Sequence, residues 1–334
     1  MSHRCLAAVL TVIAVVVLAP MAAAAQSTNT PEAPRTAWGT PDLQGVWDFR
    51  TVTPLERPEE LEGQAFLTDE EAAEFEQQLA VRRIDQPPRE GSTGTYNQFW
   101  FDRGTSVVSD RRTSLIVDPQ DGRMPPRTAA AMKRNEEVAM ARRGLTLHEL
   151  TPGGWVEDLG PGGLQLRCIT GFNSGPPMTP GAYNNNVQLF QTPDHVVLLN
   201  EMNHNARIVP LRGGAPVGLP QWTGNSRGHW EGDTLVVETT KFLRQTSFLR
   251  GATSANLRLV ERFTRVSQET LLYEAAIDDP TVWSRRWTYQ VPMRLNDQPM
   301  YEYACHEGNY GLYNILAGAR AEESAAEAAV LGSK

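Results

Sequence analysis

The chain has 334 residues, of which 40% are hydrophobic and 21% are charged, and its formal net charge at pH 7 is -8. This is the composition of an ordinary globular protein. No run of basic residues offsets the acidic balance. Binding to nucleic acid or to an anionic membrane surface is therefore disfavoured, because both need clustered Lys and Arg.

The N-terminal segment has the pattern of an export signal. His3 and Arg4 precede an apolar run over residues 6–18, and alanines at 22–25 supply the small residues of a cleavage site. The apolar run is too short to span a bilayer well. We expect cleavage after Ala25 and a soluble mature protein, periplasmic or secreted, with no segment inserted in a membrane.

The mature chain is predicted to form one domain between two less ordered ends. Residues 26–40 are rich in Thr, Pro, Ala and Ser, which is typical of a disordered leader. Residues 41–315 are expected to fold as a single β-rich domain. Residues 316–334 are rich in Ala and Glu and predict a C-terminal helix or tail.

Two helices are predicted in the N-terminal third. Thr68 is a candidate N-cap with Glu71 three residues on, the pattern of a capping box, and this helix should run to about residue 83. A second helix is expected after Pro125 and Pro126, ending before Gly144. The aromatic residues between positions 96 and 101 lie in a long Pro- and Gly-rich loop, where they either pack the loop down or line a binding cleft.

From residue 160 onward the pattern is almost entirely β. Ten strands are predicted there, at 164–170, 187–191, 196–201, 206–211, 227–231, 234–239, 257–266, 270–277, 283–291 and 300–305, after two earlier ones at 43–49 and 112–118. Short loops separate them, with no helical stretch between them. The expected fold class is therefore mainly β, an antiparallel barrel or sandwich with a few peripheral helices, and a lipocalin-like meander is one form that it could take.

A hairpin at residues 226–240 places three polar groups in a row. Side chains alternate along a strand, so Arg227, His229 and Glu231 should point to one face, with Gly228 and Trp230 on the other. A guanidinium, an imidazole and a carboxylate side by side can form the edge of a catalytic site.

Four residues are the candidate catalytic groups. His204 falls on an apolar face if the strand from residue 196 continues, and there it would act as a general base; the alternatives are a buried, hydrogen-bonded histidine or a hairpin tip. His306 and Glu307 follow Cys305 and are candidates for acid and base, or simply for a turn that caps the backbone. Arg227 is suited to stabilising the negative charge that develops on a substrate oxygen during the reaction.

The candidate substrate contacts are polar or aromatic side chains of the same strands and loops. They are Glu201, Arg207, His229, Trp230, Arg262, Tyr301 and Asn309. In the continuous-strand register, Glu201 and Arg207 lie on the face opposite His204.

No cofactor is expected. Three histidines, His204, His229 and His306, with Glu201 or Glu307 form the alternative of a zinc site. The sequence has no His-x-His, His-Glu-x-x-His or Cys-x-x-Cys pattern. It also lacks a Gly-x-Ser-x-Gly elbow, a phosphate loop and a dinucleotide fingerprint, which disfavours α/β-hydrolase and nicotinamide chemistry.

Two cysteines remain after the signal is removed. In an oxidising compartment an isolated pair favours a disulfide between Cys168 and Cys305. The alternative is a nucleophilic Cys305 beside His306.

Several motifs together resemble those of a large family of uncharacterised secreted bacterial proteins. They are RTSLIVDP at 112–119, YNNN at 183–186, EMNH at 201–204 with Arg207, the hairpin at 226–240, ERFTR at 261–265 and YEYACHEGNY at 301–310. The resemblance covers nearly the whole mature chain. It implies one integrated domain and supports the disulfide, but it brings no reaction with it.

These observations favour a cofactor-free secreted or periplasmic enzyme. A lyase, isomerase or hydrolase acting on a small organic or sugar-derived substrate fits the inventory of His and Glu as acid and base with Arg as anion stabiliser. The alternative is a non-catalytic, lipocalin-like binding protein for an apolar small molecule, and a structural envelope protein is third. An enzyme should bring His, Glu and Arg to one pocket, whereas a carrier should have an apolar cavity.

Overall fold

A computed structural model describes residues 33–85, 97–144, 163–212, 218–244, 246 and 255–332. The predicted signal segment, 1–25, lies outside the described residues. So does the start of the predicted leader; within its described end, Arg35 donates to the carboxylate of Asp233 at 2.9 Å. No helix in the described ranges has the length and hydropathy needed to cross a membrane.

The fold is built on one antiparallel sheet of ten strands, so the predicted fold class is confirmed. Its strands are β1 (Gly45–Asp48), β2 (Ile116–Asp118), β3 (Asn186–Gln191), β4 (His195–Asn200), β5 (Ala206–Pro210), β6 (Asn225–Glu231), β7 (Thr234–Thr240), β8 (Arg258–Arg265), β9 (Thr270–Asp278) and β10 (Trp287–Asn296). Nine of them follow the order β5-β4-β3-β1-β10-β9-β8-β7-β6, and β2 pairs with β10. Neighbours in sequence are mostly neighbours in space, as in a meander, except that β1 lies between β3 and β10.

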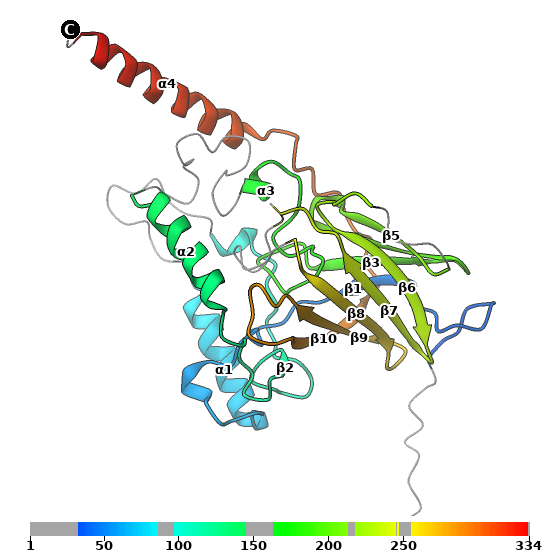
Figure 1. Cartoon of the computed structure of the whole chain (residues 1–334). Coiled ribbons are helices and arrows are strands. Elements are labelled where there is room, and N and C mark those ends of the chain that lie inside the picture. The colour runs from blue at the N-terminus through cyan, green and yellow to red at the C-terminus, as the bar shows by residue number, and fades with distance from the viewer. Residues whose placement is uncertain are drawn as a thin grey trace, which may run out of the picture.

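The sheet curls until its two edge strands lie against each other, without closing into a barrel (Figure 1). No ladder joins β5 to β6 in the described part of the chain. Their approach is seen at Gly228, where an added Cβ would come within 2.8 Å of Leu211 Cδ2 and 2.9 Å of Val209 Cγ1. Glycine is therefore needed at this position, where the backbone of β6 meets side chains from the β5 end of the sheet.

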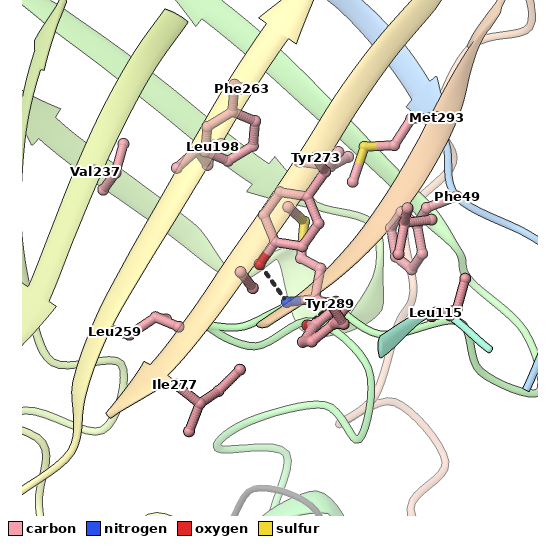
Figure 2. Packing of buried hydrophobic residues seen from close by; sticks show 14 of the residues in the cluster. Phe49, Leu115, Leu198, Val237, Leu259, Phe263, Tyr273, Ile277, Tyr289 and Met293 are labelled. Atoms are coloured by element: carbon pink, nitrogen blue, oxygen red, sulfur yellow. Dashed lines mark hydrogen bonds between the residues drawn. The ribbon is translucent and has the colours of Figure 1, made fainter. Parts of the chain in front are cut away.

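The core lies on the inner face of the curl (Figure 2). Alternate residues of the strands point inward, and the largest fully buried side chains include Trp47, Phe263, Tyr273, Trp287 and Tyr289. The rings of Phe263, Tyr273, Tyr289 and Trp287 contact one another in that order, edge to face or tilted; Tyr273 and Tyr289, for example, lie 6.2 Å apart between centroids. Aromatic and aliphatic side chains thus fill the space beneath the sheet.

The helices lie outside the sheet (Figure 1). They are α1 (Asp69–Arg82), α2 (Ala129–Ala141), the single turn α3 (Gly163–Leu166) and α4 (Tyr310–Gly332), with 3-10 turns η1 (Glu59–Leu61), η2 (Gln98–Trp100) and η3 (Met202–His204). The predicted capping box of α1 is confirmed, since Glu71 N donates to Thr68 Oγ1 and Thr68 N donates to Glu71 Oε2. The second helix starts later than predicted, with Thr128 as its N-cap. The predicted C-terminal helix is α4, which extends away from the sheet.

Two predicted strands are wrong, and both carry a cysteine of the disulfide. Residues 164–170 form α3 and a turn, in which Cys168 has a φ of 56° that no strand accommodates. Residues 300–305 form a loop. Cys168 and Cys305 are bonded to each other, as predicted. Two further strands differ in their bounds. Of the predicted strand 112–118, only β2 is a strand, because Leu115 N donates to Pro54 O in a loop and not to a neighbouring strand of the sheet. The predicted strand 283–291 is displaced and corresponds to β10.

Candidate functional site

His204 does not lie on an apolar strand face. The chain leaves β4 through η3, where Asn203 and His204 have φ values of 59° and 49°. This left-handed turn shifts the register of β5. The imidazole is consequently exposed, while Arg207 points into the core opposite Leu198. The predicted placement of these two side chains is therefore reversed.

The His204 imidazole is joined to the C-terminal loop. Its Nε2 accepts a hydrogen bond from the backbone N–H of Tyr303 at 3.0 Å. A ring nitrogen that accepts in this way carries no proton, so the neutral imidazole has its proton on Nδ1. In this arrangement His204 offers a fixed N–H donor, and its basic lone pair is already engaged.

His306 and Glu307 lie just beyond the disulfide on an exposed turn. Gly308, with a φ of 67°, allows the turn. Neither side chain has a partner among the described residues, so both are open to solvent. Asn309 has a structural task, because its Oδ1 accepts from Leu312 N at 3.2 Å in the first turn of α4.

Aromatic rings border the same loop. Tyr303 stacks on Tyr183 with 6.3 Å between centroids, and Tyr183 meets Phe172 edge to face at 5.2 Å. Tyr301 leaves 74% of its surface exposed. The backbone of Tyr303 thus contacts His204 while its ring stacks on Tyr183, and the predicted substrate contact Tyr301 lies two residues earlier on the same loop.

The hairpin β6–β7 has the predicted alternation. Trp230 packs against the core with Gly228, while the opposite face carries His229 and Glu231. Glu231 accepts from His229 Nε2 at 3.1 Å and from Arg262 Nη2 at 2.8 Å. These bonds, that of Arg262 first, lower the pKa of Glu231. Polar residues of β6 and β8 thus form a paired row on the outer surface.

Arg227 begins that row. Its Nη1 donates to the carbonyl of its own neighbour Ser226 at 2.9 Å. This hydrogen bond holds the guanidinium against β6. His204, in contrast, contacts the disulfide-bonded loop through Tyr303. Glu201 is also engaged, since its Oε2 accepts from Asn186 Nδ2 at 2.8 Å and from Asn186 N.

A buried ion pair lies inside the sheet. Both nitrogens at the tip of Arg207 donate to the carboxylate of Glu261, at 2.6 and 2.9 Å, with side-chain exposures of 3% and 0%. Tyr273 Oη donates to the same carboxylate at 2.9 Å, and it accepts from Met178 N. Burial, with the charge of Glu261 second, raises the pKa of Tyr273 and of Tyr289 well above the ordinary value. Arg207 is therefore part of the core and is not open to a substrate.

No metal site is evident in the ranges that the structure describes. Within them, no three His, Cys, Asp or Glu side chains are grouped so as to hold a metal ion.

Two clefts beside the segment 50–55 were not located by the sequence analysis. One, of about 340 Å³, is lined by Asp48, Arg50, Asp102 and Arg294. Arg50 pairs there with both aspartates, at 2.7 Å with Asp48, and the hydrogen bond to Asp48 is the main cause that raises the pKa of Arg50. The other, of about 410 Å³, lies next to it and is lined by Arg83 and Arg103. The aromatic loop that ends at residue 101 was the only pointer to this region.

Comparison of the chain with protein-family models, with characterised proteins and with solved structures finds no significant match.

Proposed function

We propose that this chain is an exported, cofactor-free enzyme that acts on a small organic or sugar-derived substrate beside the disulfide-bonded loop. The observation that carries the proposal is the hydrogen bond from Tyr303 N to His204 Nε2. Together with the Cys168–Cys305 bond, it fixes one imidazole against a loop that presents a second imidazole and a carboxylate.

The geometry suggests a role for each group. The Nδ1–H of His204 is a preorganised donor for a substrate oxygen, because its tautomer is set by the Tyr303 bond. His306 and Glu307 are unpaired in the described structure and are the groups that can give and take protons. The rings of Tyr303 and Tyr183 offer a flat apolar surface on which a sugar ring can lie.

Export is supported by three observations. The N-terminal sequence has the pattern of a signal peptide. The disulfide is typical of an oxidising compartment. No described helix could serve as a membrane anchor by crossing the bilayer.

The test begins with the purified mature protein and a panel of small organic acids, lactones and sugars, with product formation followed by NMR. On a substrate so identified, His306→Ala and Glu307→Gln should each lower kcat by about 10²–10⁴, as the loss of a general acid or base does. Glu302→Gln is the matched control, since Glu302 is exposed on the same loop.

His204→Ala should lower kcat as well and should loosen the loop, which faster exchange of the Tyr303 amide would report. Full activity of both the His306 and the Glu307 variants would show that the reaction does not take place at the disulfide-bonded loop. The absence of turnover across the panel would argue against an enzyme.

A further inference from the structure

The second cleft has the charge of a binding site for an anion. Its described lining includes two arginines, Arg83 and Arg103, and no aspartate or glutamate. This is unexpected in a chain whose net charge is -8. Burial lowers the pKa of Arg83, and the nearby positive charge of Arg103 lowers it further. The two guanidinium groups are thus close enough to repel each other, and an anion between them would relieve the repulsion.

We propose that this pocket binds the carboxylate of a small organic molecule with an apolar body. The proposal is independent of the chemistry at the disulfide-bonded loop.

Both arginines are held by contacts that leave donors available. Arg83 Nη1 donates to the carbonyl of Gly104 at 2.7 Å, which fixes the guanidinium and leaves its other N–H groups to a ligand. The guanidinium of Arg103 lies over the ring of Phe101, 4.1 Å from its centroid. A cation over a ring face keeps its N–H donors at its edge, where a carboxylate can accept two of them at once.

The apolar residues that line the rest of the pocket are the reason for proposing a ligand with an apolar body. Val52, Pro54, Leu55 and Leu115 line the pocket, and Leu115 is buried to 1% exposure. The hydroxyl of Thr53 also lines the cleft but already accepts from Val108 N at 2.9 Å. A volume of about 410 Å³ lies in the range of small-molecule sites. Inorganic phosphate could pair with both arginines but would make no contact with the apolar residues of the pocket.

The experiment measures binding by isothermal titration calorimetry on the mature protein with its disulfide intact. The probes are decanoate and 4-methylbenzoate as carboxylates, 4-methylbenzamide as the uncharged analogue of the second, and inorganic phosphate. At least one carboxylate should bind with a Kd at least about tenfold lower than that of the amide, because a hydrogen bond to a charged group is worth that factor or more.

Arg103→Gln should weaken carboxylate binding about tenfold or more without unfolding the protein, since Arg103 makes no hydrogen bond that the described structure would lose. Arg83→Gln should weaken carboxylate binding by a similar factor, and it also removes the hydrogen bond to Gly104 O. Arg212→Gln is the control, because Arg212 is an exposed arginine paired with Asp194 at the end of β5. Its variant should bind as the wild type does.

Four results would overturn the proposal. They are no binding of either carboxylate, equal binding of the amide, tighter binding of phosphate than of the carboxylates, and unchanged affinity in the Arg103 variant. Loss of turnover at the disulfide-bonded loop bears on the proposed enzyme alone, so the two ideas fail separately.

Discussion

Replacing Arg207 by Met should be among the most destabilising single substitutions in this protein. The variant keeps the length of the side chain and removes the charge that faces Glu261. With side-chain exposures of 3% and 0%, water cannot reach the carboxylate that remains. Among the described residues, only Tyr273 Oη, at 2.9 Å, would still donate to it. Breaking a buried pair in this way costs about 3–5 kcal/mol.

The size of the loss distinguishes a buried charge from an ordinary lost hydrogen bond, which would cost only about 1 kcal/mol. A second variant, Arg207→Met with Glu261→Leu, removes both charges. It should recover most of the deficit, because an apolar pair of similar volume can match a buried ion pair. What remains should be about 1 kcal/mol, for the acceptor that Tyr273 loses.

The assay is urea unfolding followed by circular dichroism at pH 7, with the disulfide intact in every variant. A loss below about 1 kcal/mol, or a double variant no better than the single one, would show that Glu261 is not held as a buried charge.

Three further outcomes follow from the core and the disulfide. Changing Cys168 and Cys305 together to Ser should lower the free energy of unfolding by about 5 kcal/mol, from the loop-entropy relation for the 137-residue separation; an unchanged urea midpoint would contradict this. Tyr273 and Tyr289 have raised pKa values, so above about pH 10 the unfolded chain releases their protons and the folded chain does not, and stability falls as pH rises. Ultraviolet titration should find these two of the eight tyrosines silent until unfolding, and all eight titrating in the folded protein would refute the reasoning. Gly228→Ala should cost about 1–3 kcal/mol by overpacking the seam between β5 and β6, measured by the same urea curves; a neutral effect would mean that the seam is loose.

The features that the sequence predicted well depend on residues close together in the chain. The capping box of α1 needs only Thr68 and Glu71, and the hairpin β6–β7 needs only its alternation and its turn. The disulfide was predictable across a long separation because only two cysteines, Cys168 and Cys305, follow the predicted signal segment.

The features it missed depend on single backbone angles or on distant segments. Two consecutive left-handed residues, Asn203 and His204, turned His204 out and Arg207 in. The side-chain pattern of β5, in which Ile208 is apolar yet exposed, gave no warning of that shift. The arginine pocket joins the end of α1 to the loop at residue 103, so no local pattern could reveal it.

The place of β1 in the sheet has a consequence for the order of folding. This first strand pairs on one side with β3 and on the other with β10, where Val46 faces Asn296 across 250 positions of sequence. Contacts of such long separation form late and slowly, because the loop between them must close first. When β1 leaves the ribosome, both of its partners are still unsynthesised. We therefore expect the nascent chain to stay open until β10 is made, which is the state that the proposed export would require.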